Sequence, residues 1–370
     1  MSKYLFQLGH QPQISIAEIQ AVFTFKNKKI KSEKKDNFLI VETEKEIDCK
    51  NIINILGGTI KIAEKITEPS VVDFLNKTPK ENKIQFSLSG NIDKKDALQI
   101  KKELKNLGRS VRYIEIKNTA TLLHNKLIEK QGDITIINNE IFVTQAIQNF
   151  TEFGDRDYNR PGVDSVSGML PPKLARIMIN LAKAKPAQTL LDPFCGSGTV
   201  LMEALDLGFK NIIGSDISKK AIGDTEKNIK WIQSTYHLPP ANYQLFNLDA
   251  IKLSSNIKTD SIDFIISEPY MGQPLYGDEK LEKLEQQAEE LAVLYTTAFK
   301  EFHKILKKDA TIIFIIPKFR HEDDWVKIDC IDNIKSKGFK LIPLSEKSDS
   351  LTYHRPKQHV ARVIWKFKKI

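Results

Sequence analysis

The sequence LLDPFCGSGT, residues 190–199, decides how the rest of the chain is interpreted. Apolar residues lead to Asp192, a turn with two glycines follows, and the apolar run of residues 200–205 then favours a helix. Gly196 and Gly198 let the backbone come close to a ligand, and the free N–H groups at the start of the helix face that ligand. This order of strand, turn and helix predicts the beginning of an open α/β domain.

The composition limits the classes of protein to which the chain can belong. Its 370 residues indicate two or three domains, and 41% hydrophobic with 28% charged residues is typical of a globular protein. No stretch reaches the roughly 18 apolar residues of a membrane helix, and we expect no signal peptide. Cys49, Cys195 and Cys330 are too few and too far apart for a disulfide framework or a zinc cluster. We therefore expect a cytoplasmic protein with no membrane partner and no metal.

The net charge of +9 is unevenly distributed along the chain. Residues 1–150 hold 24 lysines and arginines against 18 acidic residues, and the last 20 residues hold six basic residues and no acidic one. Two interpretations stay open at this point. The excess reflects a lysine-rich composition without functional meaning, or it forms a surface that binds a polyanion through its phosphates.

Periodicity predicts two small α+β units before the α/β domain. Residues 1–80 alternate short strands and helices, and residues 81–150 form a second such unit. Residues 151–170, which contain clustered Gly, Asp, Asn and Pro, predict a linker. The α/β domain is expected over residues 171–370.

The second α+β unit carries a concentration of basic residues. A basic helix is expected over residues 93–107, another helix over 121–130, and a hairpin at Asn138-Asn139. The basic residues form either a solvated face or a surface for RNA, and the arginines of the linker are either ion-pair partners within the protein or phosphate ligands. The candidates for RNA contact are Lys101, Lys105, Arg109, Arg112, Arg156, Arg160 and Arg355.

Alternating strands and helices predict a mostly parallel, seven-stranded sheet that is closed by an antiparallel C-terminal pair. Strands are expected at residues 188–192, 211–215, 243–247, 262–267, 311–316, 339–344 and 359–367, and helices at 198–207, 218–234, 278–307 and 322–337. Ligands of open α/β sheets bind beyond the carboxyl ends of the strands, so the residues at those ends are the candidate site.

Acidic residues stand at the ends of successive expected strands. Asp216 ends the second strand, about 20 residues after the glycine turn, where an acid can bind the ribose hydroxyls of an adenosine-containing cofactor. The alternative is that Asp216 caps the helix that follows. Asp249 comes after the third strand, where it can accept a hydrogen bond from an adenine amino group.

The tetrapeptide SEPY, residues 267–270, follows the fourth expected strand. An amino group conjugated to a base ring is a poor nucleophile, so a site that acts on it needs acceptors beside the amine and an aromatic surface against the base. Ser267, Glu268 and nearby carbonyls can accept hydrogen bonds, and Tyr270 can stack on a base. The alternative is a loop with a capping serine and a core tyrosine.

Taken together, these motifs resemble the THUMP-domain tRNA guanosine-N2-methyltransferases, the guanosine-10 type, over nearly the whole chain. The motifs that carry the resemblance are DPFCGSG (192–198), SEPY (267–270), YLFQLG (4–9) with ISIAEI (14–19), RDYNRP (156–161) and LPPKLAR (170–176). The tail YHRPKQH (353–359) resembles a basic hairpin near the substrate cleft of that family.

The resemblance implies a fold, a cofactor and a set of site residues. It implies a ferredoxin-like unit, a THUMP-type RNA-binding region and a Rossmann-like methyltransferase domain that transfers a methyl group from S-adenosylmethionine to tRNA. The implied catalytic residues are Ser267, Glu268, Pro269 and Tyr270. The implied cofactor-binding residues are Asp192, Pro193, Cys195, Gly196, Gly198, Asp216, Ile217, Asp249 and Ala250.

The tetrapeptide departs from the family pattern. The family usually has Asp-Pro-Pro-Tyr, and here Ser267 and Glu268 stand at the first two positions. Glu268 either supplies the missing carboxylate, changes the target base, or marks a weak enzyme. Two other functions therefore stay open: a DNA adenine or cytosine amino-methyltransferase, and a non-catalytic RNA-binding protein with a decayed tetrapeptide. A monomer is one oligomeric state that the sequence allows.

Overall fold

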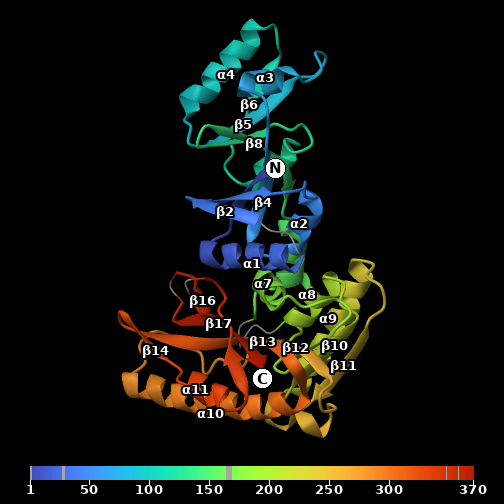
Figure 1. The fold of residues 1–370 in the computed structure, drawn as a ribbon, viewed down its shortest axis with the longest axis vertical. Helices are drawn as coiled ribbons and strands as arrows, with labels where there is room; N and C mark the ends of the chain where they lie inside the picture. The colour runs from blue at the N-terminus through green and yellow to red at the C-terminus, as the bar shows by residue number, and fades with distance from the viewer. Residues whose placement is uncertain (1, 27–29, 164–168, 347, 357) are drawn as a thin grey trace. The chain divides into compact units, whose positions relative to one another are not determined.

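The computed structural model describes residues 2–26, 30–163, 169–346, 348–356 and 358–370 (Figure 1). Its contacts divide the chain into two compact units, Met1–Pro12 with Phe23–Asn149 and Gln13–Val22 with Phe150–Ile370. The finer boundaries expected at residues 80 and 170 lie inside these units and stay predictions. Residues 164–168 of the expected linker, and residue 357 of the expected tail hairpin, lie outside the described residues.

The first unit is built on eight strands in the order β2-β3-β1-β4-β8-β7-β5-β6. The strands are β1 (Ser2–Leu8), β2 (Ile30–Lys35), β3 (Phe38–Thr43), β4 (Thr59–Lys65), β5 (Ile84–Gly90), β6 (Val111–Tyr113), β7 (Asp133–Ile137) and β8 (Glu140–Ile147). The helices are α1 (Pro12–Phe25), α2 (Cys49–Ile55), α3 (Val71–Asn76), α4 (Lys94–Asn106) and α5 (Thr119–His124). Residues 13–22 of α1 group with the second unit.

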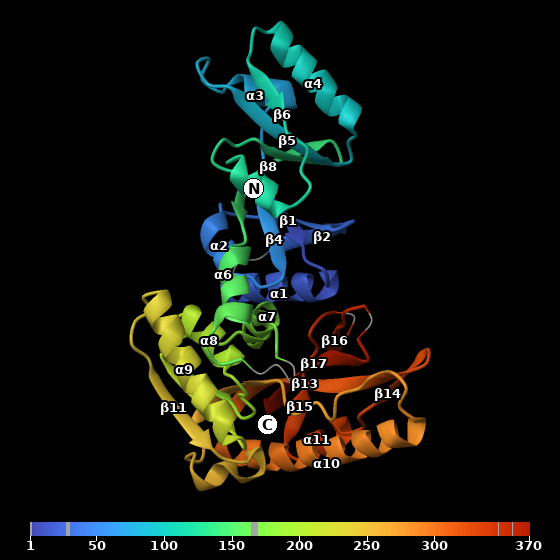
Figure 2. The same cartoon turned by 180° about the vertical axis from the view of Figure 1, so that it is seen from behind.

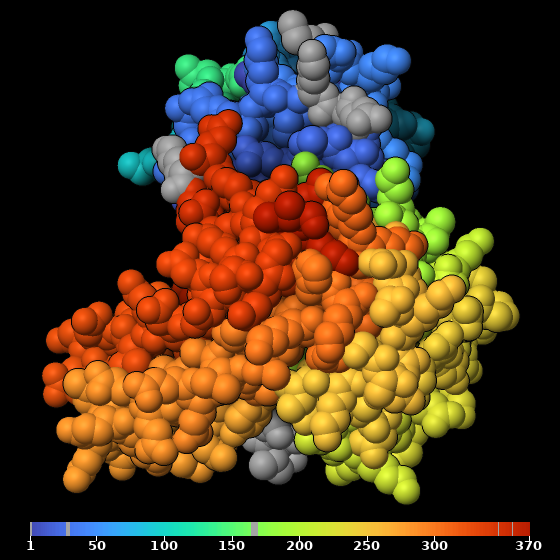
Figure 3. Space-filling view, turned by 60° about the horizontal axis from the view of Figure 1, so that its bottom comes forward, coloured from blue at the N-terminus to red at the C-terminus, as the bar shows by residue number. Residues whose placement is uncertain are grey.

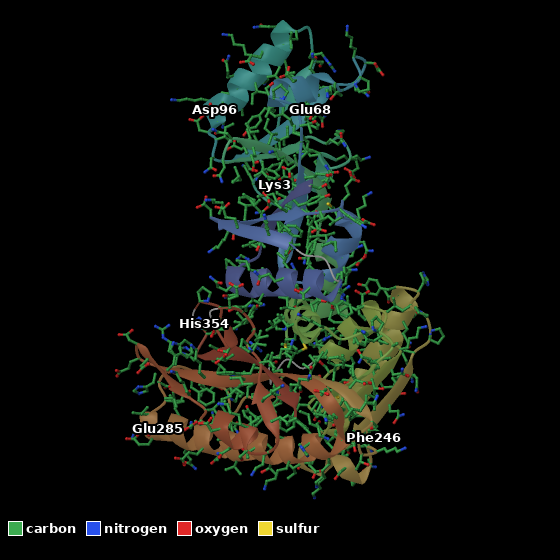
Figure 4. The ribbon with its side chains drawn as sticks, viewed as in Figure 1. Lys3, Glu68, Asp96, Phe246, Glu285 and His354 are labelled. Atoms are coloured by element: carbon green, nitrogen blue, oxygen red, sulfur yellow. The ribbon has the colours of Figure 1, made fainter. Side chains whose placement is uncertain are left out.

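Local sequence explains most boundaries in the first unit. The expected hairpin is confirmed, because Asn138 and Asn139 take φ of 52° and 62° between β7 and β8, as a tight two-residue turn requires. Helix α4 begins at a reciprocal capping box of Asp93 and Asp96, the latter labelled in Figure 4. The helix expected over 121–130 is wrong beyond His124, because Lys126 takes φ of 51°, which a right-handed helix cannot include.

The second unit is built on a nine-stranded sheet whose main path runs β11-β10-β9-β12-β13-β17-β15. The strands are β9 (Thr189–Asp192), β10 (Asn211–Asp216), β11 (Asn242–Asn247), β12 (Ile262–Ser267), β13 (Leu306–His321), β14 (Asp324–Lys327), β15 (Phe339–Leu341), β16 (Ser350–Tyr353) and β17 (Val360–Lys369). The first five strands of the path are parallel, and β17 is antiparallel to both β13 and β15. The expected sheet and its antiparallel closing pair are confirmed, with β14 and β16 as additional short strands.

Helices cover both faces of this sheet. They are α6 (Phe150–Gly154), α7 (Pro172–Ala182), α8 (Thr199–Asp206), α9 (Lys219–Thr235), α10 (Leu281–Ile305) and α11 (Ile331–Lys335), with a π-helix η1 (Asp155–Asn159) and a 3-10 helix η2 (Ala250–Ser255). Leu190 and Ile313 pack with α7, α8 and α9, while Leu191 and Ile312 pack with α10 on the opposite face. Figure 1 shows α8 and α9 beside β10 and β11, Figure 2 shows α9 beside β11 from behind, and Figure 3 shows α10 in orange at the surface. The alternation of strand side chains therefore builds two cores.

The helix expected over residues 322–337 is wrong for its first half. Strand β13 continues to His321, turns at Glu322 with φ of 50°, and pairs with β14. The helix α11 is confined to Ile331–Lys335. Trp325, Ile328 and Ile331 recur every third residue, and this spacing imitates a helix although the chain forms a hairpin here.

A buried ion cluster attaches the expected linker to the second unit. Arg156 Nε donates to Glu203 Oε1 at 2.6 Å, and Arg176 Nε donates to Glu203 Oε2 at 2.7 Å. Arg176 also pairs with Asp206, and Phe153 contacts both guanidinium groups, at 4.6 and 4.9 Å from the ring centre. Burial opposes the charge of Arg156, but the carboxylate of Glu203 raises the net pKa of that arginine. The cluster thereby joins η1, α7 and α8.

The replacement Arg156→Met tests this cluster. It leaves the fully buried Glu203 with one cation fewer, so we expect the free energy of unfolding to fall by about 3–5 kcal/mol. Urea unfolding followed by circular dichroism measures the fall. The matched control Lys230→Met removes the exposed pair Lys230–Glu226 and is expected to leave stability nearly unchanged. Equal effects of the two variants would contradict the assignment.

Candidate active site

A cavity of about 1080 Å³ lies at the carboxyl ends of the parallel strands in the second unit. Strand β9 lies between β10 and β12, so the strand order reverses at this point, where open α/β sheets bind their ligands. Of the predicted cofactor-binding and catalytic residues, those that line the cavity are Asp192, Pro193, Cys195, Gly196, Asp216, Ile217, Asp249, Ala250, Glu268, Pro269 and Tyr270. Gly198 and Ser267 are not among the lining residues.

The glycine turn between β9 and α8 has a backbone that other residues would disturb. Gly196 and Gly198 take φ of 52° and 85°, and a Cβ at Gly198 would come within 2.9 Å of Thr225 Cγ2. Thr225 Oγ1 donates to the carbonyl of Gly196 at 2.7 Å, and Asn228 Nδ2 donates to the carbonyl of Ser197 at 2.7 Å. Two side chains of helix α9 therefore fix the backbone of the turn, which lines the cavity.

Cys195 lies in this turn as a packing residue. Burial, helped by the charges of Asp192 and Asp216, raises the pKa of its thiol well above the ordinary value. A thiol in that state stays neutral, so Cys195 is unsuited to nucleophilic chemistry.

Asp216 and Asp249 present carboxylates at the ends of β10 and β11. Asp216 accepts from the backbone N–H of Gly196 at 3.0 Å and of Ser218 at 2.8 Å. Ser218, not Asp216, is the N-cap of α9, so the capping alternative is excluded. Asp249 accepts from the Ile251 N–H at 3.2 Å. Each carboxylate has lone pairs left for a ligand hydroxyl or amino group.

The side chain of Ile217 stands beside these acids. It is 72% exposed and lines the cavity, although it is apolar. An exposed apolar side chain next to two oriented carboxylates suits a ligand with a flat ring and a polar edge.

Asp192 and Ser267 connect the two central strands at the floor of the cavity. Ser267 Oγ donates to Asp192 Oδ1 at 2.6 Å, and the Phe194 N–H donates to the same oxygen at 3.2 Å. Asp192 is only 2% exposed. Burial raises the pKa of Asp192 to about 7. The charges of Asp216 and Glu268 also raise this pKa, whereas the two hydrogen bonds lower it. The hydroxyl of Ser267 is therefore occupied within the protein.

The rest of the tetrapeptide faces the cavity. Glu268 pairs with Arg362 of β17, and Arg362 Nη2 lies 3.4 Å from Glu268 Oε2. Tyr270 is 50% exposed, and its carbonyl accepts from the hydroxyl of Tyr295 at 2.7 Å. The interpretation as a core tyrosine is therefore wrong for Tyr270. The cavity combines a carboxylate with an accessible aromatic ring.

Three of the predicted RNA contacts need correction. Arg109 donates to the carbonyls of Asn76 and Thr78 at 2.6 and 2.5 Å, Arg156 binds Glu203, and Arg160 donates to Thr199 Oγ1 at 2.7 Å. All three arginines are buried. A phosphate contact requires an accessible guanidinium. These three arginines instead make hydrogen bonds within the protein.

The other four candidates are accessible. Lys105, Arg112 and Arg355 are exposed, and Lys101 is half-buried. These four residues remain candidates for RNA contact.

The sequence prediction missed Arg362, Phe194, Leu294 and His359, which also line the cavity. Arg362 comes 94 positions after Glu268 and reaches it only because β17 pairs with β13. No local motif marks such a residue. Phe194, by contrast, lies within the glycine-turn motif and could have been included.

Metal and membrane features can be stated for the described part of the chain. No cluster of three His, Cys, Asp or Glu side chains there has the geometry of a metal site. None of the described helices combines the length and the apolarity needed to cross a bilayer.

Comparison with known proteins assigns the chain to a family. A protein-family model described as "RMKL-like, methyltransferase domain" matches residues 161–327, and one described as "DNA methylase" matches residues 24–227, more than half of the chain. The chain belongs to the methyltransferase family that the second model describes. The first match contains the glycine turn, the strand-end acids and the tetrapeptide of this methyltransferase-family chain.

Curated relatives of this family member carry tRNA-modification names. A Methanocaldococcus jannaschii protein named tRNA (guanine(10)-N2)-dimethyltransferase is 30% identical over 200 residues, which are 51% of this chain and 52% of that protein. A Methanothermobacter thermautotrophicus protein of the same name is 32% identical over 152 residues, 40% and 42% of the two chains. The chain thus matches about half the length of these relatives.

Solved structures show that the Rossmann-like methyltransferase fold is shared. TrmN from Thermus thermophilus superposes with a TM-score of 0.55 at 14% identity, over all of both chains. SMU.472, a putative methyltransferase complexed with SAH, gives 0.51 at 12% identity, over 100% of this chain and 99% of that one.

The buried carboxyl of Asp192 makes the stability of this family member depend on pH. Its pKa is about 7 in the fold and about 3.9 in an unfolded chain, so between these values only the folded protein keeps the proton. The free energy of unfolding therefore falls as pH rises through this window, by at most about 1.4 kcal/mol per pH unit from this group. Urea unfolding at about pH 5, 6 and 7 measures the fall.

The control is Asp192→Asn, which keeps an acceptor for Ser267 but has no titrating group. We expect a flatter pH dependence for this variant than for the wild type. Parallel curves would show that Asp192 does not titrate in this range.

Proposed function

We propose that the protein transfers a methyl group from S-adenosylmethionine to the exocyclic N2 amino group of a guanosine in tRNA, with position ten as the first candidate, in the cytoplasm. The observation that carries this proposal is a single cavity lined both by strand-end acids and by an acidic-aromatic tetrapeptide. The names of the relatives support guanosine N2 in tRNA as the target.

The residues of the cavity fit the proposed cofactor. Asp216 has acceptor capacity for ribose hydroxyls, Asp249 for an adenine amino group, and Ile217 offers an apolar surface to the ring. Gly196 lets the backbone of the turn line the cavity without a Cβ. When bound, S-adenosylmethionine supplies an electrophilic methyl group on a sulfonium sulfur.

The tetrapeptide fits a guanine target. Guanine presents the N1–H and N2–H donors side by side, and a carboxylate is the acceptor group that matches two adjacent donors. Glu268 supplies that carboxylate, and Tyr270 supplies an accessible ring against which the base stacks. A base inside an RNA fold must leave its stack to reach such a cavity. Glu268 then orients the amine and receives the proton that methylation releases.

We further propose that tRNA binds to the basic surface of residues 81–150, in the manner of a THUMP region. The exposed side chains of Lys105 and Arg112, with Lys101, support this role, because accessible cations bind phosphates and release counterions. Arg355 offers a further cation near the carboxyl end of β16.

A DNA amino group is the second candidate target. The match described as "DNA methylase" favours it, and that match covers residues 24–227, which include the glycine turn but not the tetrapeptide. The curated relatives are named for tRNA. Duplex DNA therefore belongs in the functional test as a competing substrate.

Nucleoside mass spectrometry tests the proposed function. The purified chain is incubated with S-adenosylmethionine and either unmodified tRNA transcripts or duplex DNA, and we expect N2-methylguanosine in the tRNA. Tyr270→Ala should lower the rate by about 10- to 100-fold, since stacking on an aromatic ring contributes about 1–3 kcal/mol per base. Tyr276→Ala is the matched control, because that tyrosine is 82% exposed and is not among the lining residues.

Methylation of DNA alone would replace this proposal with the second candidate. Binding of tRNA without any binding of S-adenosylmethionine in calorimetry would instead favour the non-catalytic RNA-binding protein.

Replacement of Lys101, Lys105 and Arg112 by alanine tests the RNA surface. We expect tRNA affinity to fall about 10-fold or more at low salt and the salt dependence to flatten, since each lost phosphate contact reduces the slope by about 0.7–0.9. Filter binding at several salt concentrations measures both quantities.

The matched control removes three exposed lysines of the second unit, Lys283, Lys300 and Lys308. Their loss changes the net charge equally, so an equal loss of affinity would show that the effect is not local to the proposed surface.

A further inference from the structure

The two acceptor side chains of the tetrapeptide, Ser267 and Glu268, differ in their access to the cavity. Ser267 is fully buried, and its hydroxyl donates to Asp192 Oδ1 at 2.6 Å. It is not among the residues that line the cavity, whereas Glu268 is. An acceptor for an incoming amino group must reach the cavity surface. The acid in the second position of SEPY is therefore the one that faces the substrate.

A glutamate in this position needs a contact that fixes the orientation of its carboxylate. Its carboxylate stands at the end of one more rotatable bond than that of an aspartate, and the freedom of that bond opposes a fixed orientation. Arg362 is the cation that contacts it, with Nε on Oε1 and Nη2 at 3.4 Å from Oε2. The side chains of Glu268 and Arg362 are only 12% and 15% exposed, so solvent screens this pair weakly.

Strand pairing keeps Arg362 in place. Strand β17 runs between β13 and β16, with Arg362 opposite Pro317 on one side and Tyr353 on the other. Burial disfavours its charge, but the carboxylate of Glu268 raises the net pKa of the guanidinium, so the arginine is a permanent cation. Among the described residues, the charge of Glu268 also raises the pKa of Asp192 and of Tyr295, and Tyr353 helps to raise the pKa of Arg362.

The contact leaves part of the carboxylate available. Oε1 receives the main hydrogen bond, while Oε2 is at the long limit of a hydrogen bond from Nη2. Oε2 therefore keeps acceptor capacity for a donor that enters the cavity.

We propose that Arg362 is a positioning residue for methyl transfer, which orients the Glu268 carboxylate so that one oxygen accepts from the target amino group. This inference rests on the proposed function. In the reaction the nitrogen lone pair forms the new N–C bond, the C–S bond breaks with its electron pair going to sulfur, and the amine loses one proton. Glu268 receives that proton and releases it to solvent, while Arg362 fixes the carboxylate throughout.

A double-mutant cycle tests the proposal. Single-turnover methylation of tRNA is measured for the wild type, Glu268→Gln, Arg362→Gln and the double variant. We expect Glu268→Gln to lower the rate by about 100-fold or more, and Arg362→Gln by about 10- to 100-fold. The double variant should be no slower than Glu268→Gln within about threefold, because Arg362 acts through Glu268.

Two measurements separate positioning from folding. Calorimetry with S-adenosylhomocysteine and filter binding of tRNA should give dissociation constants within about threefold of the wild type for every variant. Arg362→Lys should recover part of the rate lost in Arg362→Gln, because an ammonium keeps the charge but not the planar fork.

Losses that multiply in the double variant would overturn the proposal, as would an unchanged rate in Arg362→Gln or the absence of any recovery in Arg362→Lys. If Arg362→Gln binds no S-adenosylhomocysteine, the role of Arg362 is structural and the proposal fails. A wild-type chain that methylates no RNA removes the proposed function together with this inference. An active wild type with multiplied losses removes this inference alone.

Discussion

The hydrogen bond from Ser267 to Asp192 joins the two strand ends on which the candidate site depends. It links β9 to β12 at the place where the strand order reverses, and it joins the last residue before the glycine turn to the first residue of the tetrapeptide. A carboxyl buried this deeply requires hydrogen-bond partners, and Ser267 and the Phe194 N–H provide them. This hydrogen bond therefore connects the strand that leads into the glycine turn with the strand that ends in the tetrapeptide.

A second set of buried polar contacts holds α8, the helix that follows the glycine turn. Glu203 of α8 is fully buried and binds arginines from η1 and α7, while Arg160 binds Thr199 at the start of α8. The segment expected to be a linker thus fastens the helix that follows the turn. Basic residues in a glycine- and proline-rich segment suggested phosphate contacts, but here the carboxylate partner is inside the protein. A basic residue in a sequence does not show whether its partner lies inside the protein or in a ligand.

The structure gives a different interpretation of Glu268, which departs from the family tetrapeptide. Read along the chain, SEPY is an imperfect version of a familiar tetrapeptide. In the structure the serine is occupied with Asp192, and the glutamate faces the cavity with an arginine beside it. The solved structures share the fold. The pair of Glu268 and Arg362 is a feature of this chain's own residues.

Much of the candidate site could be predicted from local sequence. Asp192 and Asp216 end β9 and β10, Asp249 comes two residues after β11, and the tetrapeptide begins at the last residue of β12. Parallel strands bring these carboxyl ends to one edge of the sheet. The prediction failed where a local pattern has two solutions. The threefold spacing of Trp325, Ile328 and Ile331 fits a helix, yet β13 continues and pairs with β14.

The sequence by itself determined the α/β class, the order of the strands along the chain and the acids at their ends, because these follow from hydrophobic periodicity and turn chemistry within short windows. Only the tertiary structure decided that Arg362 meets Glu268, that Ser267 is withdrawn to Asp192, and that Arg109, Arg156 and Arg160 are buried. Each of these depends on strand pairing or packing between segments far apart in the chain. A side chain's partner at such a distance is set by the whole fold and leaves no local signal.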